Sequence, residues 1–238
     1  MARSTALLFT CEHGGNRVPK QYLAIFKGHN NRLESHRGYD PGALPLARCL
    51  AKELNAPLLF STITRLLVEL NRSPGNPSLF SDITKNAPDA VRESILSTYY
   101  MPYRTEVERK IEGLLTNHDR VLHVSVHTFT PVLHGQVRRM DVGLLYDPKR
   151  PGEKALCHRW QCLIHDIAPE YVVRRNAPYR GVSDGFTTHL RRRYSAARYL
   201  GIELEVNQRL AAGSPAQKIA ITKLILNSLR AVIKGTTP

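Results

Sequence analysis

Residues 6–16 read ALLFTCEHGGN, and this stretch decides the kind of fold that we expect. Its apolar first half has the length and composition of a buried strand. The run stops at Glu12 and His13, whose side chains can transfer protons or bind zinc. The two glycines that follow allow a backbone to come close to a ligand. A strand that ends in this way predicts functional groups at the carboxyl edge of a sheet.

Outward from this stretch, apolar strand-like runs alternate with amphipathic helical patterns along the 238-residue chain. Asp40 and Pro41 form a helix-start signal, since Asp can cap a helix and proline suits its first position. The alternation predicts a single α/β domain over 1–238, with a central mixed, mostly parallel sheet flanked by helices on both faces. The expected strands are 5–11, 57–62, 66–70, 121–127, 141–146 and 201–206, and the expected helices are 41–54, 88–117, 152–166 and 215–234.

The bulk composition narrows the possible partners. A net charge of +14 favours either a polyanion or small anionic substrates. The basic residues are scattered and no nucleic-acid-binding motif is present, so nucleic acid is not expected as the main partner. No apolar run is long enough for a transmembrane helix, and the amino-terminal run is too short for a signal peptide. The four cysteines lack disulfide-framework spacing, so we expect reduced thiols in a cytoplasmic protein.

Polar side chains that can do chemistry follow four of the expected strands. Each of them alone could be an ordinary surface or turn residue. Independent turns, however, have no reason to converge on histidine and glutamate at one sheet edge. The residues concerned are His13, Glu69, Asn71, Arg72, His127, Glu203, Glu205 and Asn207.

Two histidines from separate strand ends, together with a carboxylate, would make a catalytic zinc site with one position open for water. Zinc lowers the pKa of that water and polarises a carbonyl, and a nearby glutamate can then move the proton. Arginines would bind an anionic substrate, because the guanidinium group matches a carboxylate. The candidates are Arg65, Arg72, Arg138, Arg139 and Arg180.

Several longer motifs resemble the N-formylglutamate amidohydrolase family, in the right order from about residue 6 to about residue 210. The family is similar in fold to zinc carboxypeptidases and aspartoacylase, so the resemblance implies a zinc-dependent hydrolase of amide bonds. The motifs are CEHGGNRVP (11–19), GYDPGA (38–43), TRLLVELNRSPGNPSLFS (64–81), YYMPYR (99–104), SVHTFTPVLHG (125–135), DVGLLYDPKR (141–150), RRNAPYRGVSDGFTTHLRR (174–192) and YLGIELEVNQ (199–208).

The resemblance also implies roles for individual residues. His13 and His127 match metal ligands, and Glu205 matches the general base, with Glu203 as the second candidate. The Asn71-Arg72 pair resembles the pair that binds a substrate carboxylate in the wider superfamily. Arg65 and Arg180 look like further contacts for the anion.

One departure from the superfamily pattern concerns the third metal ligand. The wider superfamily has His-x-x-Glu, and here Asn16 stands where that glutamate would be. We expect Asp40 to replace it, with Glu12 as the alternative. Asn16 would instead orient the substrate or a ligand.

The leading hypothesis is a Zn²⁺ enzyme that hydrolyses a small anionic N-acyl amino acid, N-formyl-L-glutamate above all. A second hypothesis keeps the chemistry but assigns another N-acyl amino acid or a small peptide. A third is a non-catalytic basic protein that binds nucleic acid or another polyanion, and it predicts strongly salt-dependent binding.

Overall fold

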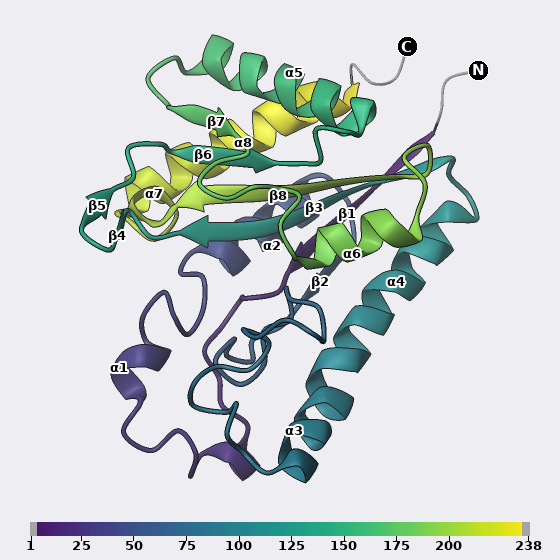
Figure 1. The fold of residues 1–238 in the computed structure, drawn as a ribbon. Coiled ribbons are helices and arrows are strands. Elements are labelled where there is room, and N and C mark those ends of the chain that lie inside the picture. The colour runs from purple at the N-terminus through teal and green to yellow at the C-terminus, as the bar shows by residue number, and fades with distance from the viewer. Residues whose placement is uncertain (1–3, 235–238) are drawn as a thin grey trace.

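The computed structural model describes residues 4–234, and its centre is a six-stranded sheet with the strand order β2-β1-β3-β8-β6-β7 (Figure 1). Only the β6–β8 pair is antiparallel among these neighbours, and the other four pairs are parallel. The mixed, mostly parallel α/β sheet that the sequence predicted is therefore confirmed. Its strands are β1 (Thr5–Cys11), β2 (Leu58–Phe60), β3 (Arg120–Phe129), β6 (Val142–Leu145), β7 (Val173–Arg175) and β8 (Tyr199–Asn207).

Helices cover both faces of the sheet, and two hydrophobic clusters fill the space beneath them. Alternate residues of β1 divide between the clusters: Phe9 and Cys11 pack with α2, α5 and α8, whereas Ala6 and Leu8 pack with α4 and α6. This division follows from the two-residue period of a strand. The helices are α1 (Asn30–Leu33), α2 (Ala43–Glu53), α3 (Asp89–Ile95), α4 (Met101–Leu115), α5 (Pro151–Ile167), α6 (Phe186–Arg193), α7 (Gln208–Ala211) and α8 (Pro215–Lys234).

Smaller elements complete the chain. A 3-10 turn, η1 (Lys20–Tyr22), follows the first strand, and a β4 (Val132–Leu133) and β5 (Gln136–Val137) hairpin follows β3. The predicted helix 88–117 contains a π-helical stretch, η2 (Leu96–Tyr100), between α3 and α4. None of the helices within residues 4–234 is long and apolar enough to cross a membrane.

The predicted strand 66–70 is wrong, because residues 66, 67 and 70 belong to turns and residues 68–69 have no regular secondary structure. The apolar side chains of this run are buried in the cluster beneath α4, but other side chains satisfy its backbone. Thr84 donates to the carbonyl oxygens of Leu66 and Leu67, and Arg104 donates to that of Leu70. A buried carbonyl that finds such donors needs no neighbouring strand.

The glycines after β1 also act differently from the expectation. A Cβ atom on Gly14 would lie 2.8 Å from the carbonyl oxygen of Ser61, and one on Gly15 would lie 2.8 Å from that of Thr62. The Gly14 amide donates to the same Ser61 oxygen. The two glycines therefore let the chain after β1 pack against residues 61–62, and this contact fixes the direction in which His13 leaves the strand.

Candidate functional site

The candidate site lies at the carboxyl ends of β1, β3 and β8. His13 follows the end of β1, and His127 in β3 stands in register with Glu205 in β8. Asp40 comes from the segment before α2, and its amide donates to the carbonyl oxygen of His13. A pocket of about 220 Å³ opens onto these four side chains. That size is below the ~300–1,000 Å³ that is usual for drug-sized ligands, so the pocket suits a small molecule.

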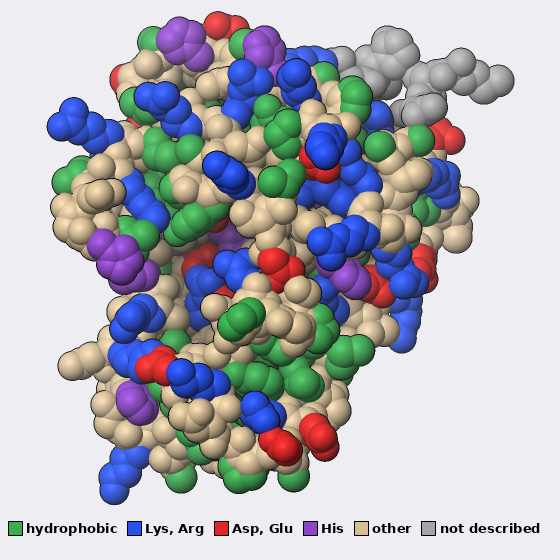
Figure 2. Space-filling view, in the orientation of Figure 1, with side chains coloured by type: hydrophobic (Ala, Val, Ile, Leu, Met, Phe, Trp, Pro, Cys, Tyr) green, Lys and Arg blue, Asp and Glu red, His purple; other side chains and the backbone are tan. Residues whose placement is uncertain are grey.

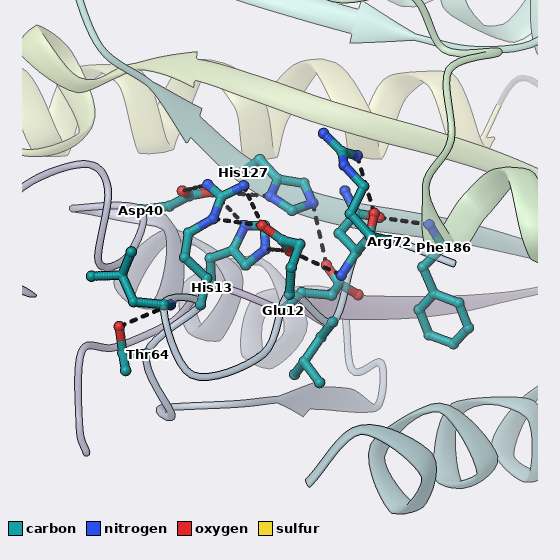
Figure 3. A network of polar contacts seen from close by, with 12 residues as sticks. Glu12, His13, Asp40, Thr64, Arg72, His127 and Phe186 are labelled. Carbon is teal, nitrogen blue, oxygen red and sulfur yellow. Dashed lines mark hydrogen bonds and ion pairs between the residues drawn. The ribbon is translucent and has the colours of Figure 1, made fainter. Parts of the chain in front are cut away.

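His13, Asp40 and His127 are buried and form a group that could bind a metal ion. One ligand atom from each of the three lies within 4.8 Å of the others. Asp40 Oδ2 lies 3.3 Å from His13 Nδ1 and 2.9 Å from His127 Nδ1, and Figure 3 shows both imidazoles beside this carboxylate. Two imidazoles and a carboxylate are a donor set that zinc accepts in catalytic sites.

The charges within this group are strongly coupled. Burial alone would lower the pKa of His127, but its contacts with Asp40 and Glu12 raise that pKa well above its usual value. Burial and Arg65 would lower the pKa of His13, and Glu69 and Asp40 raise it. Burial would raise the pKa of Asp40, yet the two histidines and Arg65 hold it well below its usual range. The carboxylate is therefore ionised and available as a ligand.

The outer nitrogen of His13 contacts a second carboxylate. His13 Nε2 bonds to Glu69 Oε1, on the edge of the ring away from Asp40. Arg65 in turn contacts both acids: its Nη1 lies 3.1 Å from Asp40 Oδ1 and its Nε lies 2.7 Å from Glu69 Oε2. Burial would raise the pKa of Glu69, but Arg65 and His13 hold it well below its usual value.

The outer nitrogen of His127 contacts a third carboxylate. Glu12 Oε2 lies 3.2 Å from His127 Nε2 and accepts a hydrogen bond from Ser125 Oγ at 2.7 Å. Tyr103 donates to the other oxygen of Glu12. Of the two carboxylates considered as the third ligand, Asp40 thus faces the Nδ1 atoms of both histidines, and Glu12 lies behind the ring of His127.

Glu205 is a buried carboxyl group beside the three residues of the metal group. Its Oε2 atom is buried and has no hydrogen-bond partner among residues 4–234. Burial is the largest cause that raises the pKa of Glu205 to about 8, and the charges of Asp40 and Glu203 add to it. A carboxyl group with a pKa near neutrality can take up and release a proton during turnover. Glu203 lines the same pocket and accepts a hydrogen bond from Thr187.

The expected substrate residues occupy different surroundings. Arg65, Asn71, Arg72 and Arg180 all line the pocket. The Asn71 side chain accepts from the Phe186 amide at 2.6 Å, and Arg72 Nη1 donates to the backbone carbonyls of Asn71 and Asp184. Arg180 is exposed, and its side chain has no hydrogen bond or ion pair among the residues that the structure describes.

Asn16 lies outside this arrangement. Its side-chain amide donates to the carbonyl oxygen of Leu33 at 3.2 Å, and it is absent from the lining of the pocket. In the structure, Asn16 thus ties the chain after β1 to the end of α1.

Three further residues belong to the site, and the sequence reasoning gave them no role in it. The sequence indicates Glu69 only as a polar residue at the end of an expected strand, although it lies two positions before Asn71 in one motif. Asp184 lines the pocket and accepts hydrogen bonds from Ser73 and Asn76, and Tyr179 lines the same pocket. Both lie within the long 174–192 motif, and this motif was the available signal.

The basic residues are spread over the molecule. On the face drawn in Figure 2, the blue Lys and Arg side chains extend from top to bottom and do not gather in one patch. The pocket itself combines three arginines with four acidic side chains. Such a pocket can bind an anionic group at its arginines while its carboxylates hold a cation.

Comparisons with known proteins bear on the family and the fold of the chain. A model of the N-formylglutamate amidohydrolase family matches residues 5–212. A gene product of Agrobacterium tumefaciens has a similar structure, with 26% identity and a TM-score of 0.80 over 98% of this chain and 92% of that chain. The N-formylglutamate amidohydrolase of Ralstonia eutropha shares the fold at 18% identity, with a TM-score of 0.67 over 98% of this chain and 96% of that one. The comparison with curated proteins found no match.

Proposed function

Because the chain belongs to the N-formylglutamate amidohydrolase family, we propose that it hydrolyses the amide bond of a small N-acyl amino acid. The proposed substrate is N-formyl-L-glutamate, which would give formate and L-glutamate. The observation that carries this proposal is the buried group of His13, Asp40 and His127 beside the unpartnered carboxyl oxygen of Glu205. A zinc amidase needs such a set of ligands next to such a base.

His13, Asp40 and His127 would hold the zinc ion. Bound there, zinc would supply a water molecule of lowered pKa and would polarise the acyl carbonyl. Glu205 accepts one proton from the attacking water. It then delivers this proton to the amide nitrogen as the C–N bond breaks, so that formate and an amine leave. The pKa of about 8 for Glu205 lies close to neutrality, where a group can perform both transfers.

Two arginines of the pocket support an anionic amino acid as the substrate. Arg72 and Arg180 line the pocket and neither forms an ion pair with a carboxylate within residues 4–234. Guanidinium groups of this kind bind carboxylates with good geometry. They would hold the substrate's carboxylates and exclude acyl compounds that lack them.

The test is a hydrolysis assay on the zinc-loaded protein. The substrates are N-formyl-L-glutamate, N-formyl-L-alanine, which lacks the second carboxylate, and N-acetyl-L-glutamate, which has a larger acyl group. We expect the highest kcat/KM with N-formyl-L-glutamate, and we expect Glu205→Gln to lower kcat by about 10²–10⁴-fold. A preference for N-acetyl-L-glutamate would assign another acyl group to the same chemistry. If none of them is hydrolysed, the proposed activity is wrong, and salt-dependent polyanion binding becomes the hypothesis to measure.

A further inference from the structure

The surroundings of Arg65 differ from those of an arginine that waits for a substrate. All three of its side-chain nitrogens contact carboxylates of the protein: Nη1 contacts Asp40 Oδ1 at 3.1 Å, and Nε and Nη2 contact Glu69 Oε2 at 2.7 and 2.5 Å. The two carboxylates are buried, and Arg65 is 27% exposed. Its charge is therefore already paired twice before any substrate arrives.

These contacts close a ring of four side chains. His13 contacts Asp40 through Nδ1 and Glu69 through Nε2, and Arg65 joins the far oxygens of the same two acids. A closed ring constrains each member from two sides. His13 cannot rotate without breaking a contact to one acid, and Asp40 cannot rotate without losing either Arg65 or the histidines.

The ring also determines which atoms face the metal group. A carboxylate oxygen accepts hydrogen bonds, so the hydrogen bond between Glu69 Oε1 and His13 Nε2 places a proton on Nε2. The lone pair of a neutral His13 is then on Nδ1, toward Asp40. Arg65 engages Asp40 Oδ1 and leaves Oδ2 between the two imidazoles. Partners behind metal ligands commonly fix the tautomer and orientation in this manner.

We propose that Arg65 and Glu69 are positioning residues that orient His13 and Asp40 for the metal, and that Arg65 is not a substrate arginine. This inference rests on the proposed function, since it assumes that the group holds a metal ion. It divides the arginines of the pocket by role. Arg72 and Arg180 remain for the substrate's carboxylates, because the Arg72 side chain donates only to backbone carbonyls and the Arg180 side chain has no hydrogen bond or ion pair among the described residues.

The experiment compares three variants with the full-length wild-type protein: Arg65→Lys, Glu69→Gln and, as the matched control, Arg72→Lys. Both lysine substitutions keep the positive charge within the same pocket. A difference between them therefore reports the loss of the guanidinium geometry and not the loss of charge. The readouts are the dissociation constant for Zn²⁺ by chelator competition, the visible spectrum of the Co²⁺-loaded protein, and KM for N-formyl-L-glutamate. Circular dichroism verifies that each variant is folded.

We expect Arg65→Lys and Glu69→Gln each to weaken metal binding by about 10–100-fold and to change the Co²⁺ spectrum. Arg72→Lys should keep the metal affinity and the spectrum of the wild type and should raise KM. If Arg65→Lys fails to fold, the isosteric Glu69→Gln variant tests the same ring.

Two results would overturn the inference, and they differ in what they leave standing. If all variants bind metal as tightly as the wild type with the same spectrum, Arg65 and Glu69 do not position the ligands, but the proposed function survives. A rise in KM for Arg65→Lys in that case would assign Arg65 to the substrate. If the wild type itself binds neither Zn²⁺ nor Co²⁺, the proposed function fails together with the inference.

Discussion

The two histidines of the metal group are held by different chemistry. His13 and His127 each direct Nδ1 toward Asp40 and Nε2 toward a buried glutamate. Behind His13, the glutamate is Glu69, which forms an ion pair with Arg65. Behind His127, the glutamate is Glu12, which accepts hydrogen bonds from the hydroxyl groups of Ser125 and Tyr103.

The different partners of Glu69 and Glu12 show that a carboxylate behind a histidine can be kept ionised in two ways. An ion pair supplies an opposite charge, whereas hydroxyl groups supply only hydrogen bonds. Burial would raise the pKa of Glu12, and its contacts with His127 and Ser125 hold that pKa well below its usual value. Since His127 forms the one ion pair of Glu12 within residues 4–234, the two sides of the site should respond unequally when a histidine is removed.

The largest effect should come from His127→Ala in the metal-free protein. It leaves the buried charge of Glu12 without an opposite charge, and breaking a buried pair in this way costs about 3–5 kcal/mol. His13→Ala should cost roughly 2 kcal/mol less, because Glu69 and Asp40 both keep Arg65 as a partner. Urea unfolding near neutral pH measures both free energies of unfolding.

The pair of variants controls for cavity formation, because both remove the same imidazole from positions that are 2% and 3% exposed. Equal losses of stability would contradict the distinction between the two sides. A larger loss for His13→Ala would reverse it.

A smaller effect is expected from Glu205, which belongs to neither side. Its pKa is raised from 4.5 to about 8 in the folded protein, so between these values the folded protein holds a proton that the unfolded chain has released. The resulting stability is fully present below the lower value and is lost as the pH rises through the upper one. Glu205→Gln has no carboxyl group to ionise, so at about pH 6 its stability should exceed that of the wild type by about 2 kcal/mol more than at about pH 4.

Unfolding of both chelator-treated proteins across this range measures the prediction. The charge of His127 affects the pKa of Glu205, so the difference between the two curves reports Glu205 together with its coupling to His127. A difference that stays constant with pH would mean that Glu205 ionises in the native protein as it does in the unfolded chain.

The sequence predicted those strands and helices well in which the burial of one face imposes a regular spacing of apolar side chains. The strand expected at 5–11 is β1 with the same bounds, and the helix expected at 215–234 is α8. The apolar run at 66–70 looked like a strand because burial requires apolar residues in a turn as much as in a strand. Its backbone partners, Thr84 and Arg104, are distant in sequence and no local pattern indicates them.

The residues of the site also fall into those that a local sequence pattern indicates and those that it does not. Strand-end position indicated His13, His127 and Glu205, since parallel strands bring their carboxyl ends to one edge. To predict Asp40 as a site residue, one must assume that a residue at the start of a helix can face the same pocket. The carboxylate of Asp40 does line that pocket. The arrangement of Arg65 with Glu69 could not be predicted, because it depends on the turns at 64–72. Residue type alone does not separate an arginine that is already paired from one that is free.

The most direct test of the account is the metal content of the purified protein after dialysis against Zn²⁺, measured by elemental analysis for the wild type and for Asp40→Asn. Asparagine keeps the size of the side chain at the contact point of both histidines but removes the charge of the ligand. The account predicts about one zinc ion per wild-type chain and a large loss in the variant. No zinc in the wild type, or equal zinc in both proteins, would contradict a metal centre formed by His13, Asp40 and His127.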